Sequence, residues 1–138
     1  MHRNRIIAGP RLRIALLLSL LSLAGCDDDA GLDAELDAVT IEEGRARLTF
    51  RNTGSQEISL YGCPSGPRTP YERWSGAAWV DGGVVNDSCI GDRDWVIAPG
   101  VDKLYDVPMP SGRFRFYLWI GRGEEGDLLV RSNAIDVL

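Results

Sequence analysis

The stretch "RFRFYLWIG" (Arg113–Gly121) decides the fold class of this chain. Its apolar side chains, Phe114, Phe116, Leu118 and Ile120, alternate with Arg113, Arg115, Tyr117 and Trp119. Successive side chains of a β-strand point to opposite faces of a sheet, so this alternation predicts a strand with one buried and one exposed face. The same period runs through "ARLTFRNTG" (46–54) and "QEISLYG" (56–62). No window of comparable length after residue 26 has helical periodicity.

Turn signals divide the chain at short, regular intervals. Examples are "NTG" at 52–54 and Pro99-Gly100. The strands expected between the turns are 36–41, 45–51, 57–62, 70–74, 77–80, 101–107, 113–120 and 128–138. Alternating strands separated by turns about every 8 to 12 residues are typical of an antiparallel sandwich or barrel. The sequence therefore predicts an all-β domain of seven or eight strands.

The order of these segments resembles the immunoglobulin-like and fibronectin-III-like domains of bacterial envelope proteins. The resemblance rests on "RLTFRNTG", "APG", "VPMPSGRFRFYL" and "SNAIDVL", and it spans residues 36–138. It implies a single antiparallel sandwich. Such folds host many functions, so the resemblance assigns no activity.

The first 25 residues have the two parts of a secretory signal. Four arginines and no acidic residue precede an apolar run at 14–23. A basic region followed by a short apolar region marks an export signal. Ten residues of helix cover about 15 Å, roughly half of a bilayer's hydrocarbon core, so a cleaved signal is favoured over a permanent span.

The end of this signal, Leu23-Ala24-Gly25-Cys26, resembles the lipobox of bacterial lipoproteins. In that family the cysteine receives a diacylglycerol thioether and becomes the new amino terminus. The resemblance implies a protein anchored by lipid to a membrane of the bacterial envelope, facing the periplasm or the cell surface. An ordinary secretory signal that ends near Cys26 is the alternative. The acidic segment 26–35 is expected to be a flexible tether, because it has too little apolar surface to fold.

Cysteine arithmetic agrees with lipidation. Lipid on Cys26 leaves Cys63 and Cys89 to form a disulfide in an oxidising compartment. A metal site or free thiols are the alternatives, but CxxC spacing is lacking and no histidine follows His2. The disulfide is expected to tie loops together, because Cys63 follows a strand and Cys89 lies in the irregular stretch 81–93.

Charge and composition exclude several function classes. The net charge of −5 becomes −9 when the four arginines of residues 1–25 leave, which argues against nucleic acid as a partner. His2 leaves with the signal, so histidine-dependent catalysis is excluded, and no glycine-rich phosphate loop is present. We expect a monomer without a cofactor or a metal. Calcium bound at Asp87, Asp92 and Asp94 is the alternative to an ordinary polar loop, and the loop is favoured.

Candidate binding residues fall into two groups. The first lies in the segments 62–70 and 81–95 that the disulfide would tie together. The members named there are Arg68, Tyr71, Asp87, Asp92, Arg93 and Trp95. The second group is Tyr117 and Trp119, which face away from the core, while Trp74 and Trp79 are expected to pack together across a turn.

These observations predict a non-catalytic envelope module that binds a protein or polysaccharide or acts as a structural accessory. A proteinase inhibitor that presents "CPSGPRTPY" (63–71) is the first alternative. A carboxylate-based enzyme is the second.

Overall fold

The structure is a computed structural model that describes residues 31–121 and 128–138, and these residues form an all-β fold. Their strands are β1 (Ala34–Glu42), β2 (Arg45–Asn52), β3 (Ile58–Cys63), β4 (Gly66–Pro67), β5 (Thr69–Trp74), β6 (Trp79–Val85), β7 (Arg93–Ile97), β8 (Asp102–Pro108), β9 (Gly112–Ile120), β10 (Leu128–Arg131) and β11 (Ile135–Val137). The predicted signal and residues 26–30 of the predicted tether, Cys26 included, lie outside the described residues. The all-β prediction is confirmed.

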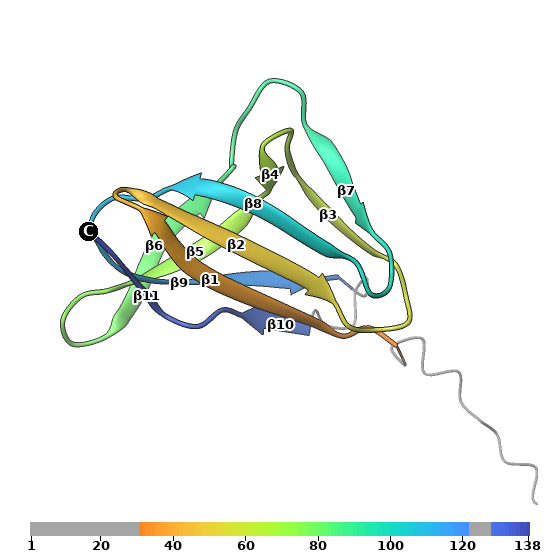
Figure 1. The fold of residues 1–138 in the computed structure, drawn as a ribbon, viewed down its shortest axis with the longest axis horizontal. Helices are drawn as coiled ribbons and strands as arrows, with labels where there is room; N and C mark the ends of the chain where they lie inside the picture. Colours follow the sequence, from red (N-terminus) through yellow and green to blue (C-terminus); the bar gives the residue numbers. More distant parts are fainter. Residues whose placement is uncertain (1–30, 122–127) are drawn as a thin grey trace, which may run out of the picture.

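The strands form three antiparallel sheets (Figure 1). One sheet has the order β1-β2-β8, and a second has the order β10-β9-β5-β6, with β11 also paired to β9. The third sheet is small and has the order β4-β3-β7. The inner faces of all three sheets contribute to one hydrophobic core, so the two larger sheets pack as layers of a β-sandwich.

The alternation read from the sequence determines which side chains fill this core. Leu48 and Phe50 of β2 are fully buried, as are Phe114 and Phe116 of β9. The side chains between them stay at least partly exposed, as the strict alternation of burial along both strands shows. Burial of each large apolar side chain stabilises the fold by about 1.5–3 kcal/mol, so these two strands form the centre of the sandwich.

The structure corrects the predicted strand boundaries in the second half of the chain. The segment 81–95 is mostly strand, because β6 continues to Val85 and β7 begins at Arg93. "DGG" at 81–83 has the composition of a turn, but it forms a bulge opposite β5, and Gly83 has a φ of 115° there. The last strand divides into β10 and β11, which both pair with β9. β1 begins at Ala34, two residues before the expected start.

Two asparagines tie the layers together. Asn52 is fully buried, and its amide donates to the carbonyls of Gln56 (2.7 Å) and Ile97 (2.9 Å). Asn133 bonds both the amide and the carbonyl of Ala38, each at 2.9 Å, on the side of β1 that has no neighbouring strand. Pairing the groups of an edge strand in this way protects the edge from other chains.

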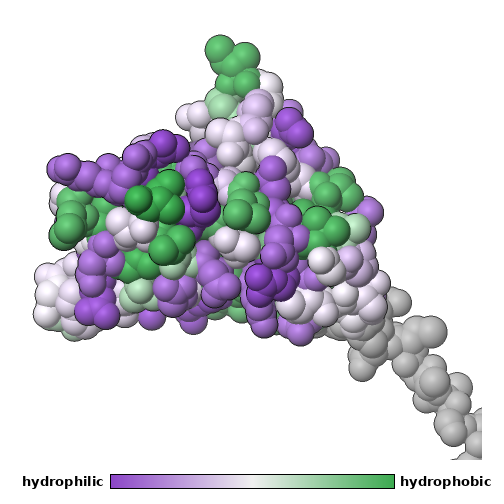
Figure 2. Space-filling model, viewed as in Figure 1, coloured by the Kyte–Doolittle hydropathy of each residue, from purple (hydrophilic) through white to green (hydrophobic). Residues whose placement is uncertain are grey.

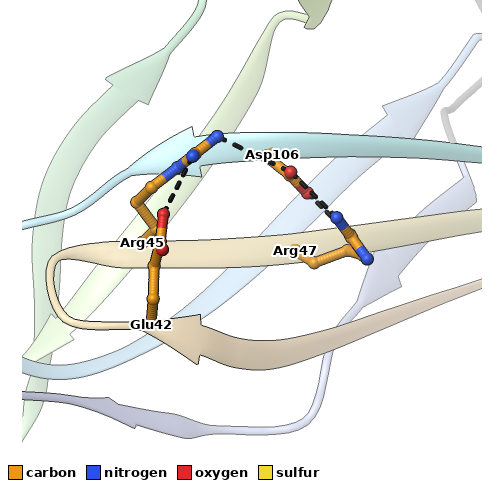
Figure 3. A network of polar contacts seen from close by, with 4 residues as sticks. All are labelled: Glu42, Arg45, Arg47 and Asp106. Carbon is orange, nitrogen blue, oxygen red and sulfur yellow. Dashed lines mark hydrogen bonds and ion pairs between the residues drawn. The ribbon is translucent and has the colours of Figure 1, made fainter.

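The outer face of β1-β2-β8 carries ion pairs between neighbouring strands (Figure 3). Arg47 donates to both oxygens of Asp106, at 2.7 and 3.0 Å. Arg45 lies 3.6 Å from the same carboxylate and 2.9 Å from Glu42. The hydrogen bond from Arg47 lowers the pKa of Asp106. Because each charge has an opposite neighbour, this part of the face is neutralised within the protein.

The same face continues toward the start of β8 in the same manner. Arg51 of β2 pairs with Asp102 at 2.9 Å and with Glu35 at 3.1 Å. Apolar side chains on this face, such as Leu104, stand between the charged ones, and Figure 2 shows apolar and hydrophilic areas interleaved. Within residues 31–121 and 128–138, no helix is long and apolar enough to cross a membrane.

Candidate functional site

Cys63 and Cys89 form a disulfide, as the cysteine arithmetic predicts, and their Cα atoms are 5.7 Å apart. Cys63 ends β3 and is 3% exposed, whereas Cys89 lies in the irregular segment 86–92. The bond therefore attaches that segment to the end of a core strand and does not cross between the two main sheets. A cross-link over this separation restricts the unfolded chain and stabilises the fold by about 3–4 kcal/mol.

The hairpin of β3 and β4 is held tightly against the core. A Cβ atom at Gly62 would lie 2.5 Å from the carbonyl oxygen of Gly66, and one at Gly66 would lie 2.7 Å from the ring of Tyr105. Thr69 is fully buried, and its hydroxyl is 2.7 Å from that of Tyr105. Burial raises the pKa of Tyr105. Close packing and the Thr69–Tyr105 hydrogen bond therefore hold the β3–β4 hairpin in place.

The segment 86–92 protrudes from the sandwich between β6 and β7 (Figure 1). Asn86 adopts a φ of 54°, and its amide donates to the carbonyl of Pro67 at 3.1 Å. Ser65 donates to the side-chain oxygen of Asn86 at 2.8 Å. Ile90 is fully exposed, and Figure 2 shows an apolar tip at the top of the molecule. The base of the segment is thus fixed by hydrogen bonds and the disulfide, while its tip is uncovered.

A depression of about 340 Å³ lies between β3 and β9, beside this fixed hairpin. Its lining residues are Ser59, Leu60, Tyr61, Arg68, Pro70, Leu118 and Trp119. Tyr61 and Trp119 are each 53% exposed. Large aromatic side chains that are this exposed in one hollow are typical of interaction sites. We call this hollow the β3–β9 depression.

Polar contacts orient two of the lining residues. Arg68 is 2.6 Å from Asp87, which belongs to the protruding segment. The hydroxyl of Tyr61 donates a hydrogen bond to Asp92, and that bond is the main cause of the raised pKa of Tyr61. Partial burial and the nearby carboxylate of Asp94 raise it further. The depression and the disulfide-linked segment are therefore one connected structure.

The structure brings together residues that the sequence assigned to two separate surfaces. The sequence places Arg68 in the group of disulfide-linked segments and Trp119 in the second group of candidate binding residues, but both line the β3–β9 depression. Asp87 and Asp92 contact it through Arg68 and Tyr61. Sequence reasoning did not name Tyr61, although "QEISLYG" places it at an outward position of the alternation.

Tyr71 is half-buried and packs against the core, and it also lines a second hollow of about 470 Å³ together with Asp87, Cys63 and Cys89. Its ring centroid lies 5.7 Å from that of Phe114 and 6.1 Å from that of Phe116. The cause is register: Tyr71 pairs with Phe116 across β5 and β9, and paired residues share one face of the sheet.

Trp95 and Arg93 also lie outside the β3–β9 depression. The indole of Trp95 is partly buried and donates to the carbonyl of Cys63 at 2.9 Å. The guanidinium of Arg93 lies 4.3 Å from its ring centroid, and the ammonium of Lys103 lies 3.5 Å from it. Burial, and then the charge of Arg93, lower the pKa of Lys103. These residues brace β7 and do not line the depression.

The remaining aromatic residues form a separate group on the β5-β6-β9 sheet. Trp74 and Trp79 pack with ring centroids 5.5 Å apart, as predicted. Arg115 lies 4.5 Å from the ring of Trp79 and forms an ion pair with Glu72. Tyr117 is partly exposed and is absent from the lining of the depression. Trp74, Trp79 and Arg115 are therefore engaged in contacts within the sheet.

The part of the chain that the structure describes shows no cluster of metal-ligating side chains. No group of three or more His, Cys, Asp or Glu side chains there is arranged to hold an ion. The calcium arrangement weighed for Asp87, Asp92 and Asp94 is therefore not formed.

Comparisons with known proteins assign no family. No known family and no curated protein matches the chain. Among solved structures, it is similar to a β-glucosidase from Listeria innocua in complex with gluconolactone, with 11% sequence identity and a TM-score of 0.32. The match covers 78% of this chain and 17% of that enzyme, so the chain spans less than a fifth of its length. A similarity this low says nothing about activity.

Proposed function

We propose that this chain is a lipid-anchored protein of the bacterial envelope whose immunoglobulin-like sandwich is a non-catalytic binding module. The anchor is inferred from Leu23-Ala24-Gly25-Cys26, which lies outside the described residues. Two antiparallel sheets around one core support an immunoglobulin-like or fibronectin-III-like architecture. A disulfide supports an oxidising compartment.

The β3–β9 depression is the observation that carries the binding role. It combines Tyr61, Trp119 and Arg68, and tyrosine, tryptophan and arginine are the residue types that dominate binding energy at interfaces. The contact of Arg68 with Asp87 and the disulfide hold its rim in place without a partner. A surface ordered in advance loses less entropy on association and binds more tightly.

The two alternatives have less support. An inhibitor that presents residues 63–71 needs an accessible loop, but Gly66, Pro67 and Thr69 are buried there. For a carboxylate-based enzyme, the observation is limited to Asp106, whose pKa is lowered by Arg47 and which is therefore unsuited to act as a general acid.

The anchor and the binding role are tested separately in cells. A clickable fatty acid fed to cells should label the wild-type protein and leave a Cys26→Ser variant unlabelled. Equal labelling of the two proteins would contradict the anchor.

For the binding role, formaldehyde cross-linking of intact cells should give adducts of the full-length wild-type protein. A Tyr61→Ala/Trp119→Ala variant should lose them, because loss of hot-spot residues weakens association by about 30-fold or more. A Val39→Ala/Leu104→Ala variant removes similarly exposed side chains from the other sheet and serves as the control. Adducts that persist in the first variant, or vanish in both, would contradict the assignment.

A further inference from the structure

An apolar patch extends from the β3–β9 depression onto the small sheet. Val96 of β7 is 59% exposed and lies directly opposite Ser59, which lines the depression. Cross-strand partners share one face, so Val96 lies on the same exposed face of β3 and β7 as Tyr61, and Trp119 lines the depression beside Tyr61. Each is more than half exposed. An apolar patch of this kind on a small domain is typical of a protein contact.

The rim of this patch is acidic. Asp94 pairs with Tyr61 across β3 and β7 and is exposed, and Asp92 accepts the hydrogen bond of the Tyr61 hydroxyl. Among the described residues, neither carboxylate forms an ion pair. The cation of the depression, Arg68, is already neutralised by Asp87 at 2.6 Å. The rim therefore presents negative charge that the protein does not balance.

The nearby cations do not neutralise the rim. Arg93 and Lys103 both lie against the ring of Trp95. Trp95 alternates along β7 with Asp94 and Val96, so its side chain belongs to the opposite face of that strand. The acidic rim and the two cations are thus separated by the sheet itself.

We infer that the β3–β9 depression binds a protein segment in which lysine or arginine flanks apolar side chains. This inference rests on the proposed function and adds the chemistry of the partner. The apolar side chains cover Tyr61, Val96 and Trp119. A cation beside them is attracted both by the faces of the aromatic rings and by Asp92 and Asp94.

A polysaccharide fits this surface less well. A sugar buries many hydroxyl groups, and each one needs a hydrogen-bond partner when it leaves water. The polar side chains lining the depression are those of Ser59, Tyr61 and Arg68, and two of these are engaged with Asp92 and Asp87. An anionic polysaccharide would in addition be repelled by the acidic rim.

The test measures binding of defined probes to the full-length protein in nonionic detergent, by fluorescence anisotropy against empty micelles. The probes are a labelled 12-residue peptide of lysines and leucines, the same peptide with glutamate in place of lysine, and a labelled neutral dextran. We expect the lysine peptide to bind. Its affinity should fall at least about tenfold in Trp119→Ala and in Asp94→Lys, and it should fall as salt is raised.

Asp37→Lys is the matched control, because Asp37 is an exposed acid on β1 and the change in charge is the same. Equal losses in Asp37→Lys and Asp94→Lys, or no loss in Trp119→Ala, would show attraction to net charge alone and overturn the inference. Trp119-dependent binding of the glutamate peptide or dextran would overturn it and leave the proposed function standing. Failure of all three probes while Trp119-dependent cross-links persist in cells would overturn only the inference. Failure of both would overturn the proposed function too.

Discussion

The outer face of β1-β2-β8 and the β3–β9 depression both expose charged and apolar side chains, but they differ in whether the charges are paired within the protein. On the charged face, arginines on β2 are matched by carboxylates on the neighbouring strands, as Arg47 is by Asp106. At the depression, Tyr61 and Trp119 stay uncovered, and Asp92 and Asp94 lack ion pairs among the described residues. On the first surface the arginines of β2 are paired with carboxylates within the protein, whereas at the second the carboxylates of Asp92 and Asp94 have no such partner among the described residues.

The two regions also differ in how they are held together. The charged face lies on long strands paired over seven or more residues, so its geometry follows from the ladder itself. The depression lies between β9 and the shorter strand β3, and the disulfide joins the end of β3 to the segment 86–92. The difference teaches that this domain uses a local cross-link where strand pairing is short, which is where we propose that a partner binds.

Loss of the disulfide should have the largest effect. A Cys63→Ala/Cys89→Ala variant is expected to lose about 3 kcal/mol of unfolding free energy, because the cross-link no longer restricts the unfolded chain. For a domain of this size that corresponds to a fall in Tm of more than about 10 °C, measured by circular dichroism. Reduction of the wild-type protein should give the same fall. A Tm unchanged by both treatments would show that the end of β3 holds without the bond.

Gly66→Ala should have the next largest effect. The added methyl group would lie 2.7 Å from the Tyr105 ring, which is buried and cannot move away freely. Overpacking of this kind is expected to destabilise the protein by about 1–3 kcal/mol in denaturant unfolding. Ser88→Ala, at an exposed position of the neighbouring segment 86–92, is the comparison. Equal stability of the two variants would contradict the tight packing of the hairpin.

Asp106→Asn tests the charged face, and its effect should be small and dependent on pH. The folded-state pKa of Asp106 is lowered, so the carboxylate contributes stability above its unfolded pKa of about 3.9, and this contribution is lost as pH falls through the folded pKa. We expect Tm to fall slightly in Asp106→Asn at pH 7 and to match the wild type in strong acid. A difference of the same size at both pH values would exclude a role for the charge.

Trp119→Ala should change stability least of the four. The side chain is half exposed, and substitutions at such positions usually alter the unfolding free energy by about 0.5 kcal/mol or less. The same variant is predicted above to lose binding, which would separate binding from folding. A large loss of stability in urea would instead make Trp119 a structural residue.

The sequence predicted what depends on local pattern. The alternation in 46–54 and 113–121 correctly assigned the inner and outer faces of β2 and β9, because burial in a strand has a period of two. The disulfide followed from counting cysteines. The sequence did not predict β7. In "RDWVI" the exposed Val96 is apolar, like the partly buried Trp95 and the buried Ile97 beside it, so the segment has no apolar–polar alternation.

The candidate site was predictable only in part. Arg68, Asp87, Asp92 and Trp119 were named from the sequence, but their meeting at one depression depends on how β3 packs beside β9. The ring of Tyr71 packs against Phe114 and Phe116 because of the register of β5 against β9, and a shift of one residue would reverse the face. Register of this kind is set by long-range pairing and leaves little trace in the local sequence.

The most direct test of the account compares two equally exposed positions in living cells. A photo-cross-linking amino acid is introduced at position 119, in the depression, or at position 104, on the charged face; the native side chains there are 53% and 52% exposed. We expect a discrete cross-linked protein partner from position 119 and none from position 104. Partners from position 104 alone, or the same partners from both, would contradict the claim that the depression is the binding surface.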